Sequence, residues 1–459
     1  MGIVRHLSDL RLVKTIVNIW KIEELRKRLL ITFIFVVIYR FGTFIILPGV
    51  DPLPLSQRTG SSEGLLGLLD MFSGGAFANA SIFALGIMPY ISASIVIQLL
   101  GIALPYFQKL QREGESGRSK LNQYTRYLTV LILMFQAPAY LLGTLRGGAV
   151  VEGMEMAIVP GGMAFWTFLL PSTIILAAGS MFVLWLGERI TDKGVGNGIS
   201  FIILVGIIAR LPHALLGEFA SRLSDQAGGL VMFLIEIVAL LLIIAAAILL
   251  VQGTRKVPLQ YAKRVVGNKQ YGGARNYLPL KVNAANVMPI IFAQAIMFIP
   301  ITFASYTEKT GGFWASLTDF TSVPYCVLQA LLIIAFTYFY TAVTVNPQQI
   351  AEDLKRNNGF IPGVKPGKKT ADYIDEIMSR ITLPGSIFLA LVAIMPAFAS
   401  IFGVSREFTQ FFGGTSLLIL VGVVLDTLQQ IESHLLNRHY DGLLKSGRIK
   451  GRSGSIAAY

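Results

Sequence analysis

Residues 230–252 read LVMFLIEIVALLLIIAAAILLVQ, an apolar run whose only charge is Glu236. An α-helix needs about 20 apolar residues to cross the hydrocarbon core of a bilayer, so this run predicts a transmembrane helix. A carboxylate inside such a helix is a functional-site hypothesis. We expect Glu236 either to pair with Arg210 or to lie near the outer interface of the membrane.

The composition of the whole chain agrees with this local prediction. Of the 459 residues, 54% are hydrophobic and only 14% are charged, whereas a soluble domain carries roughly 25% charged residues. Lipid must therefore cover much of the surface. The first residues are charged, which argues against a cleavable signal peptide. The single cysteine, Cys326, excludes an intramolecular disulfide framework, and the four histidines lack metal-ligand spacing, so no metal site is predicted.

Nine further apolar runs complete an expected all-α polytopic membrane protein. The ten predicted spans are 29–47, 79–104, 127–145, 163–186, 199–216, 230–252, 287–305, 323–345, 383–403 and 413–431. Because ten spans divide into five and five, the second half would enter the membrane from the opposite side, as in inverted repeats. The expected organisation is a cytoplasmic segment 1–28, an N-terminal half 29–216, a C-terminal half 217–431 and a cytoplasmic tail 432–459.

The distribution of basic residues sets the expected orientation. Most of the 39 lysines and arginines fall near the two termini and in alternate loops, and cytoplasmic loops are the ones enriched in these residues. The opposite loops have one each: Arg58, Arg146, Arg222, Lys309 and Arg406. Both termini are therefore predicted to be cytoplasmic. Two cytoplasmic loops, 253–286 and 346–382, are longer than most connections and are expected to project as docking surfaces.

A short apolar segment precedes the second span. Residues 64–77, GLLGLLDMFSGGAF, are too few to cross a membrane, and the pair Gly74 and Gly75 permits a sharp reversal of the chain. One interpretation is a helix that rests on the membrane surface. The other is a helix folded back between the spans, which is permitted only where protein encloses it or where it lines a cavity. The residues alone favour neither.

The glycine-rich stretch 193–198, KGVGNG, raises the question of a nucleotide-binding loop. Its residue order differs from that of a phosphate-binding loop, and it joins two membrane helices, so the nucleotide interpretation is rejected. We expect a tight cytoplasmic turn with Asn197 or Ser200 near the start of the next helix. No other segment offers an ATP site, so the energy for transport would come from a partner or from protein synthesis.

Seven motifs occur in order along the chain: MFSGGAF (71–77), SIFALGIMPYISASIVIQLL (81–100), GESGRSKLNQYTRY (114–127), WLGERITDKGVGNGIS (185–200), LPLKVN (278–283), IPGVKPGKKTADYID (361–375) and FGGTSLLIL (412–420). With them the chain resembles the bacterial SecY family of protein-conducting channels. The resemblance implies a central pore in the bacterial inner membrane that passes unfolded preproteins and releases transmembrane segments sideways. It implies no enzymatic activity and no cofactor. The implied partners are the SecE and SecG subunits, the SecA ATPase, the ribosome, signal peptides, nascent preproteins and membrane lipid.

The resemblance identifies the segment 64–75 as a plug that blocks the closed pore from the outer side. The implied plug residues are Leu68, Leu69, Met71, Phe72, Ser73, Gly74 and Gly75. A short helix that ends in glycines and does not span the membrane fits this role. The resemblance therefore favours the folded-back interpretation of this segment.

The resemblance also implies a ring of aliphatic side chains at the waist of the pore. Matched motif by motif, the ring consists of Ile87, Ile91, Ile199, Ile203, Ile291 and Ile419. The first four form two pairs with a spacing of four residues, which places each pair on one helix face. A narrow apolar collar dewets and blocks ions without offering specific polar contacts to a passing chain. The alternative for each isoleucine is an ordinary lipid-facing or packing residue.

In the family, spans two, three, seven and eight form a lateral gate that opens toward lipid. The residues expected there are Pro89, Ser92, Gln98, Gln136, Asn286 and Pro289. Hydrogen bonds between helices inside a membrane contribute only about 0.6–2 kcal/mol, so a hydrophobic signal helix could separate these spans. Static packing between helices is the alternative role for each amide.

In the family, the long cytoplasmic loops bind the SecA motor or the ribosome, whose RNA suits basic loops. The implied docking residues are Arg255, Lys256, Lys263, Arg264, Lys269, Lys355, Arg356 and Lys365. Lys365 stands where the family motif usually has arginine, and Asn268 reduces an expected basic pair. Lysine keeps the charge but loses the bidentate fork of arginine, so partner affinity is expected to differ. Anchoring of the topology by positive charge is the alternative role of each cluster.

Two rival functions fit the sequence less well. A small-solute secondary transporter would need a polar binding site at the middle of the membrane, where this chain has isoleucines. An intramembrane enzyme would need paired aspartates, a Ser/His pair or a metal site within the spans, and the spans have none of these. A pore for polypeptides is therefore the predicted function.

Overall fold

The computed structural model describes residues 22–50, 70, 72–141, 149–151, 154–156, 165–224, 229–261, 264–266, 269–271, 275–285, 287–294, 296–297 and 322–445. Most of these residues are helical. The helices are α3 (Glu23–Gly42), α6 (Met88–Ala103), α7 (Pro105–Arg112), α8 (Glu115–Tyr140), α9 (Phe165–Lys193), α10 (Gly198–Ser224), α11 (Gly229–Gln252), α14 (Val323–Thr344), α15 (Pro347–Arg356), α16 (Lys368–Ile401), α17 (Arg406–Thr409) and α18 (Gly414–Lys445).

Several of these helices can cross a membrane. Within the described ranges, six helical segments are long and apolar enough, and they lie in α9, α10, α11, α14 together with α15, α16 and α18. A seventh candidate is broken, because α6 and α7 meet at an angle of 102°. Leu104, between them, is extended, with φ −112° and ψ 126°, as expected for a residue that precedes a proline. The chain is therefore a mostly helical membrane protein with several candidate spans.

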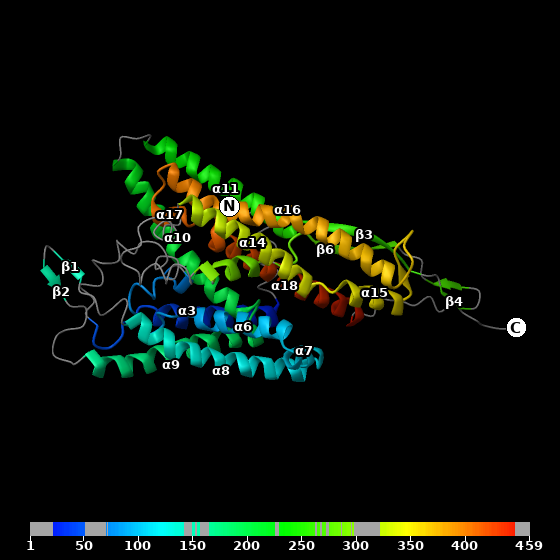
Figure 1. Cartoon of the computed structure of the whole chain (residues 1–459), viewed down its shortest axis with the longest axis horizontal. Coiled ribbons are helices and arrows are strands. Elements are labelled where there is room, and N and C mark those ends of the chain that lie inside the picture. Colours follow the sequence, from blue (N-terminus) through cyan, green and yellow to red (C-terminus); the bar gives the residue numbers. More distant parts are fainter. Residues whose placement is uncertain are drawn as a thin grey trace.

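The long helices form two groups (Figure 1). Helices α3, α6, α8 and α9 lie together in one group, and α11, α14, α16 and α18 lie together in the other. Helix α10 packs against α9 and α3 of the first group and against α11, α18 and α17 of the second. Helix α10 therefore contacts members of both groups.

The second predicted span starts later than expected. The sequence predicts a helix over 79–104, whereas residues 74–87 form turns and α6 begins at Met88. Pro89 occupies the first turn of α6, where its missing N–H removes no helical hydrogen bond. Gly74 and Gly75 have φ values of +65° and +94°, which glycine adopts without strain. Apolar composition does not distinguish such an enclosed irregular segment from a helix.

The described residues include strands, most of them in the two long loops that are predicted to be cytoplasmic, so the prediction of an all-α fold is wrong there. The strands are β1 (Ala149–Val151), β2 (Met154–Met156), β3 (Thr254–Tyr261), β4 (Arg264–Val266), β5 (Lys269–Tyr271), β6 (Arg275–Lys281) and β7 (Gly359–Phe360). Strands β3 and β6 pair antiparallel, and β7 from the second long loop pairs with the far end of β3. The two loops therefore form one three-stranded sheet, in the order β6-β3-β7.

An apolar core fixes this sheet to the neighbouring helices. Val257, Leu259 and Leu280 of the sheet are buried against Leu354 of α15 and Ile374 of α16. Alternate residues of β3 are buried, which is the period of a half-buried strand. The sheet is thus packed onto α15 and α16.

The other span boundaries differ in a systematic way. Helices α8 and α16 begin at Glu115 and Lys368, well before the predicted starts at 127 and 383, and α10 extends to Ser224, past the predicted end at 216. Helices therefore continue beyond the apolar runs that predict them. The predicted span 287–305 is helical over most of its described part, which ends at Met297, and its remainder lies outside the described residues.

A buried ionic network connects α10 to α11 and to the turn before α17. Arg222 bonds to the carboxylates of Glu218 at 2.9 Å and Glu236 at 2.6 Å, and it donates to the carbonyl of Gly403 at 2.7 Å. The second Glu218 oxygen accepts from the Ser405 amide at 2.8 Å. The expected pair between Glu236 and Arg210 is therefore wrong. Arg222 also lies on α10, not in the loop to which the sequence assigned it.

We expect Arg222→Gln to lower the stability of the protein sharply. It leaves the Glu218 and Glu236 carboxylates buried without a cation, and the loss of one partner from a buried pair typically costs about 3–5 kcal/mol. Thermal unfolding of the detergent-solubilised protein measures the effect. The control is Arg380→Gln, because Arg380 and Glu376 form a pair whose side chains are 78% and 60% exposed, and such pairs contribute little. An unchanged melting temperature for Arg222→Gln would contradict the role of this network.

Candidate functional site

The glycine-rich turn before α10 sets the position of that helix. The Asn197 side chain accepts hydrogen bonds from the amides of Ile199 at 3.1 Å and Ser200 at 3.4 Å, as a residue that caps a helix N-terminus does. Gly196 has a φ of +83°, and its amide donates to Gln430 of α18 at 2.9 Å. The predicted tight turn with Asn197 at the helix start is confirmed, and it attaches the start of α10 to α18.

The six predicted ring isoleucines come together in two adjoining apolar clusters. Ile203 and Ile419 are 8% and 4% exposed in one cluster, and Ile91, Ile199 and Ile291 pack against it. Ile87, 5% exposed, belongs to a second cluster, which Ile91 and Ile199 also contact. The two clusters therefore share two side chains, and four separate segments of the chain supply the six isoleucines.

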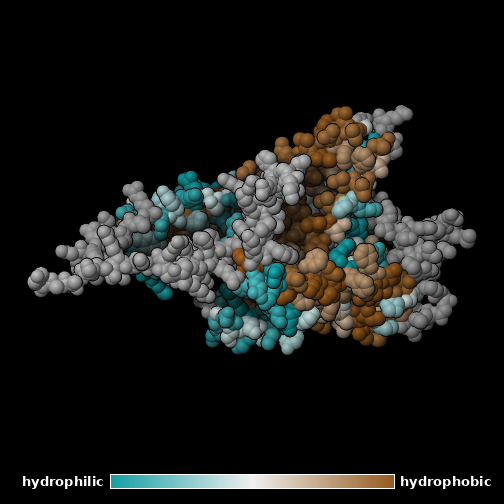
Figure 2. Space-filling view, turned by 180° about the vertical axis from the view of Figure 1, so that it is seen from behind, coloured by the Kyte–Doolittle hydropathy of each residue, from teal (hydrophilic) through white to brown (hydrophobic). Residues whose placement is uncertain are grey.

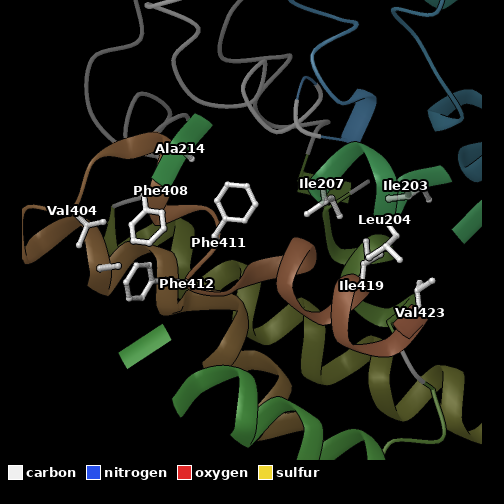
Figure 3. Close-up of a cluster of buried hydrophobic side chains, with 11 residues drawn as sticks. Ile203, Leu204, Ile207, Ala214, Val404, Phe408, Phe411, Phe412, Ile419 and Val423 are labelled. Atoms are coloured by element: carbon white, nitrogen blue, oxygen red, sulfur yellow. The ribbon is translucent and has the colours of Figure 1, made fainter. Parts of the chain in front are cut away.

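The first cluster contains side chains that the sequence did not single out. In Figure 3, Ile203, Leu204 and Ile207 of α10 lie opposite Ile419 and Val423 of α18. Ile207 and Val423 each follow a predicted ring isoleucine by four residues. The same one-turn spacing that pairs Ile199 with Ile203 was the signal that could have found them. The contact between α10 and α18 is thus longer than the predicted ring.

The described part of the predicted plug packs against this cluster. Phe72 contacts the cluster that contains Ile203 and Ile419, and Ser73, Gly74 and Gly75 are buried. The segment approaches α10 so closely that a Cβ added to Gly74 would lie 2.8 Å from the Cα of Gly206. Leu68, Leu69 and Met71 lie outside the described residues. Of the two interpretations of this segment, the described residues fit the one in which protein encloses it.

Three side chains satisfy backbone carbonyls of this irregular segment. Tyr39 donates to the Ser73 carbonyl at 3.1 Å, and Arg40 donates to the Gly74 carbonyl at 2.8 Å. Tyr140 of α8 donates to the Phe77 carbonyl at 2.8 Å. A buried carbonyl without a partner costs free energy comparable to a lost hydrogen bond, so these donors stabilise the fold of the segment.

One buried carboxylate of the segment has a charged partner. Asp70 is 2% exposed and forms an ion pair with Arg210 of α10. Its other oxygen accepts from the Ala78 amide at 2.7 Å. The sequence did not assign Asp70 a role. The available signal was its position as the only charge in an apolar segment, but nothing in the sequence indicated its partner.

The predicted gate residues are divided between two places. Pro89, Ser92 and Gln98 lie on α6, which packs against α8. Pro289 is buried in the segment that follows β6, whose Phe292 ring stacks on Phe336 of α14, with ring centres 5.7 Å apart. Asn286 lies outside the described residues.

Neither of the two described amides, Gln98 and Gln136, forms the expected hydrogen bond to a neighbouring helix. Gln98 donates to Ser94 of its own helix at 3.3 Å, and Gln136 is exposed on α8. Ser92 likewise donates to the Met88 carbonyl of its own helix at 3.1 Å. The interhelical hydrogen bonds expected from the sequence are thus replaced, at Gln98, by a bond within α6.

The basic residues of the long loops gather at one end of the molecule. Figure 2 shows hydrophobic residues over the long helices and hydrophilic ones toward the end that carries the three-stranded sheet and α15. The exposed predicted docking residues there are Arg255, Lys256, Lys355, Arg356 and Lys365. Arg264 and Lys269 lie on β4 and β5, and Lys263 lies outside the described residues.

The turn that carries Lys365 is fixed by a glycine on each side and by a hydrogen bond from the first turn of α16. Gly363 and Gly367 on either side have φ values of +84° and +102°, and the Lys365 carbonyl accepts from the Thr370 hydroxyl at 2.9 Å. The side chain therefore projects from a fixed turn. Among the described residues, no group of three His, Cys, Asp or Glu side chains could hold a metal ion.

Comparison with known proteins gives consistent results. Residues 81–428 match the family model described as SecY. The protein translocase subunit SecY of Streptomyces coelicolor is 42% identical over 437 residues, which cover 93% of this chain and 98% of that protein. The subunit from Chlamydia trachomatis is 40% identical over 455 residues, which cover 95% of this chain and 99% of that protein.

Two solved structures share the fold at low sequence identity. One is described as the structure of a protein conducting channel, with a TM-score of 0.62 and 17% identity over 93% of this chain and 95% of that one. The other is Sec61 in the canine ribosome-channel complex, with a TM-score of 0.56 and 16% identity over the same shares. The family match, the sequence relatives and the fold agree: the chain belongs to the SecY family and is the protein-conducting channel subunit of a Sec translocase, a transport protein and not an enzyme.

Proposed function

We propose that polypeptides cross this channel through a waist formed by the six isoleucines, with the segment 64–75 as the plug above it. The observation that carries the proposal is the packing of isoleucines from four separate segments into clusters that share Ile91 and Ile199. Phe72 of the plug segment packs against the same cluster that contains Ile203 and Ile419. An apolar waist and the plug that blocks it would be in contact in this way.

The chemistry of the waist suits a substrate of arbitrary sequence. A passing chain presents every kind of side chain, so specific polar contacts at the waist would hold some segments and delay others. A narrow collar of aliphatic groups dewets and blocks ions while it offers each segment only weak contacts. The aliphatic clusters around Ile203 and Ile87 supply this kind of surface.

The proposed membrane organisation has ten spans in two inverted halves, 29–216 and 217–431, around a central pore. Both termini are on the cytoplasmic side of the bacterial inner membrane. The excess of basic residues in the predicted cytoplasmic loops supports this orientation. The hydrophilic end of the molecule, where the three-stranded sheet lies, would then face the cytoplasm.

The lateral gate is proposed between the α6/α8 pair and the pair formed by α14 and the segment that precedes it. Each pair is packed within itself, by the contacts of α6 with α8 and of Phe292 with Phe336. Because Gln98 is bonded within its own helix, separation of the pairs need not break that bond. Signal peptides and transmembrane segments of nascent preproteins would leave sideways through this gate into lipid.

The three-stranded sheet and the Lys365 turn are the proposed docking surface for SecA and the ribosome. The pairing of β7 with β3 makes the two loops one platform, and its exposed lysines and arginines suit an RNA or acidic partner. The canine Sec61 relative is described in a ribosome-channel complex. SecE and SecG complete the proposed translocase, and SecA or protein synthesis supplies the energy.

We expect Ile87→Ser and Ile419→Ser each to increase ion leak during translocation, because a hydroxyl wets the collar and the smaller side chain widens it. Conductance of reconstituted channels with a stalled preprotein measures the leak. A cysteine in the stalled chain should crosslink to cysteines at positions 91, 199 and 291. Labelling of these three positions from lipid alone, and never from the passing chain, would show that the pore runs elsewhere.

Deletion of residues 64–75 should raise the conductance of the resting channel and permit export of proteins with defective signal sequences, because nothing then covers the collar. Planar-bilayer conductance and an export assay are the two measurements. Normal conductance combined with normal signal selectivity would rule out a plug at this position.

Lys365→Glu should impair SecA-driven export, because it places an acidic group on the proposed docking turn. Transport of a preprotein into inverted vesicles measures the effect. Lys27→Glu serves as the control, because Lys27 is an exposed lysine on α3, outside the docking surface. Full SecA-driven transport by Lys365→Glu would remove Lys365 from the docking surface.

A further inference from the structure

The Asp70 carboxylate is buried, and each of its two oxygens has a partner. The carboxylate is 2% exposed, one oxygen pairs with Arg210 and the other accepts from the Ala78 amide. The other donors to this segment, Tyr39, Arg40 and Tyr140, bond to neutral carbonyls. Among these contacts, the Asp70–Arg210 pair alone joins two opposite charges.

The partner of Asp70 stands on the face of α10 that carries the isoleucines. Ile199, Ile203, Gly206 and Arg210 follow one another at spacings of four, three and four residues, which keeps them on one helix face. Gly206 contacts the backbone of Gly74. Along this face, the collar is followed by the contact with the plug segment and then by the arginine that pairs with its carboxylate.

The two members of the pair differ in their access to water. The Asp70 side chain is 3% exposed, whereas the Arg210 side chain is 26% exposed. Loss of the arginine would leave a buried carboxylate without a counter-charge, and a buried unpaired charge is strongly unfavourable. Loss of the carboxylate would leave a cation that water already reaches. The pair therefore favours the seated segment for as long as both charges are present.

We infer that the Asp70–Arg210 pair is a latch that holds the plug over the collar and sets which signal sequences can open the channel. The inference rests on the proposed function, in which this segment is the plug. When the plug leaves, the pair separates and Asp70 gains water. A signal sequence must then supply, through its own binding, the free energy that the pair contributes to the closed state. A weaker pair lowers that requirement, so less hydrophobic signals open the channel.

The test uses the full translocase in proteoliposomes and in cells, with the variants Asp70→Asn, Arg210→Gln and the double variant. We expect Asp70→Asn to raise resting conductance about threefold, and Arg210→Gln about tenfold or more, because the latter leaves the buried carboxylate unpaired. The double variant should fall back to the level of Asp70→Asn, since it removes that charge. Export of a protein with a shortened apolar signal should rise in the same order.

Three controls separate the latch from a general loss of structure. Arg210→Lys keeps the charge and should stay within about twofold of the parent. Glu376→Gln makes the same carboxylate-to-amide change in the exposed pair with Arg380, away from the plug segment, and it should leave conductance unchanged. Comparable assembly of all variants, seen as intact complexes on gel filtration, ensures that the leak reports the seated plug.

Parental conductance and parental signal selectivity in both Asp70→Asn and Arg210→Gln would overturn the latch. Additive effects in the double variant would also overturn it, because two charges that act as a pair are not additive. Deletion of residues 64–75 distinguishes the two levels of inference. A leaking deletion beside silent pair variants would reject the latch and retain the plug, whereas a silent deletion would reject both.

Discussion

The absence of water from the hydrocarbon core is the constraint on which the rest of this structure depends. Backbone amides and carbonyls at membrane depth must find partners within the protein, yet residues 74–87 are not helical. The carbonyls of Ser73, Gly74 and Phe77, in and next to this stretch, accept hydrogen bonds from Tyr39, Arg40 and Tyr140, which come from α3 and α8. The irregular segment therefore requires these helices around it, and in return it fixes how close they stand to one another.

Small residues make this enclosure possible. A Cβ on Gly179 of α9 would lie 2.1 Å from the carbonyl oxygen of Ile82, and one on Gly206 would lie 2.8 Å from that of Phe72. Gly74 in turn needs its positive φ to turn the chain at that point. Without side chains at these positions, α9 and α10 approach the backbone of the segment directly, as helices do in membranes where dispersion contacts replace the hydrophobic effect.

The sequence predicted those features that depend on residues close together in the chain. Apolar runs located the long helices, and the Asn197 turn followed from its glycines and capping residue. The late start of α6 was not predictable, because residues 79–87 are as apolar as a span and are enclosed by partners distant in sequence. The predicted pair of Glu236 with Arg210 was wrong for a related reason. Helix α10 continues beyond its apolar run, so Arg222 lies on the helix, one turn after Glu218, and pairs with that residue and with Glu236.

The roles of the ring, plug and docking residues remain predictions, because they depend on contacts across the membrane and with other subunits.

Helix α10 carries two arginines that bind different parts of the molecule. Arg210 faces the plug segment and pairs with Asp70, whereas Arg222, twelve residues later, lies about a third of a turn away and binds α11 and the turn before α17. The first arginine attaches α10 to the segment that α3 and α8 enclose, and the second attaches it to the other helix group. A displacement of α17 relative to α3 must therefore either break the Arg222 network or move α10. Because a buried network of three charges is costly to break, movement of α10 is the easier response, and it carries Arg210 with it.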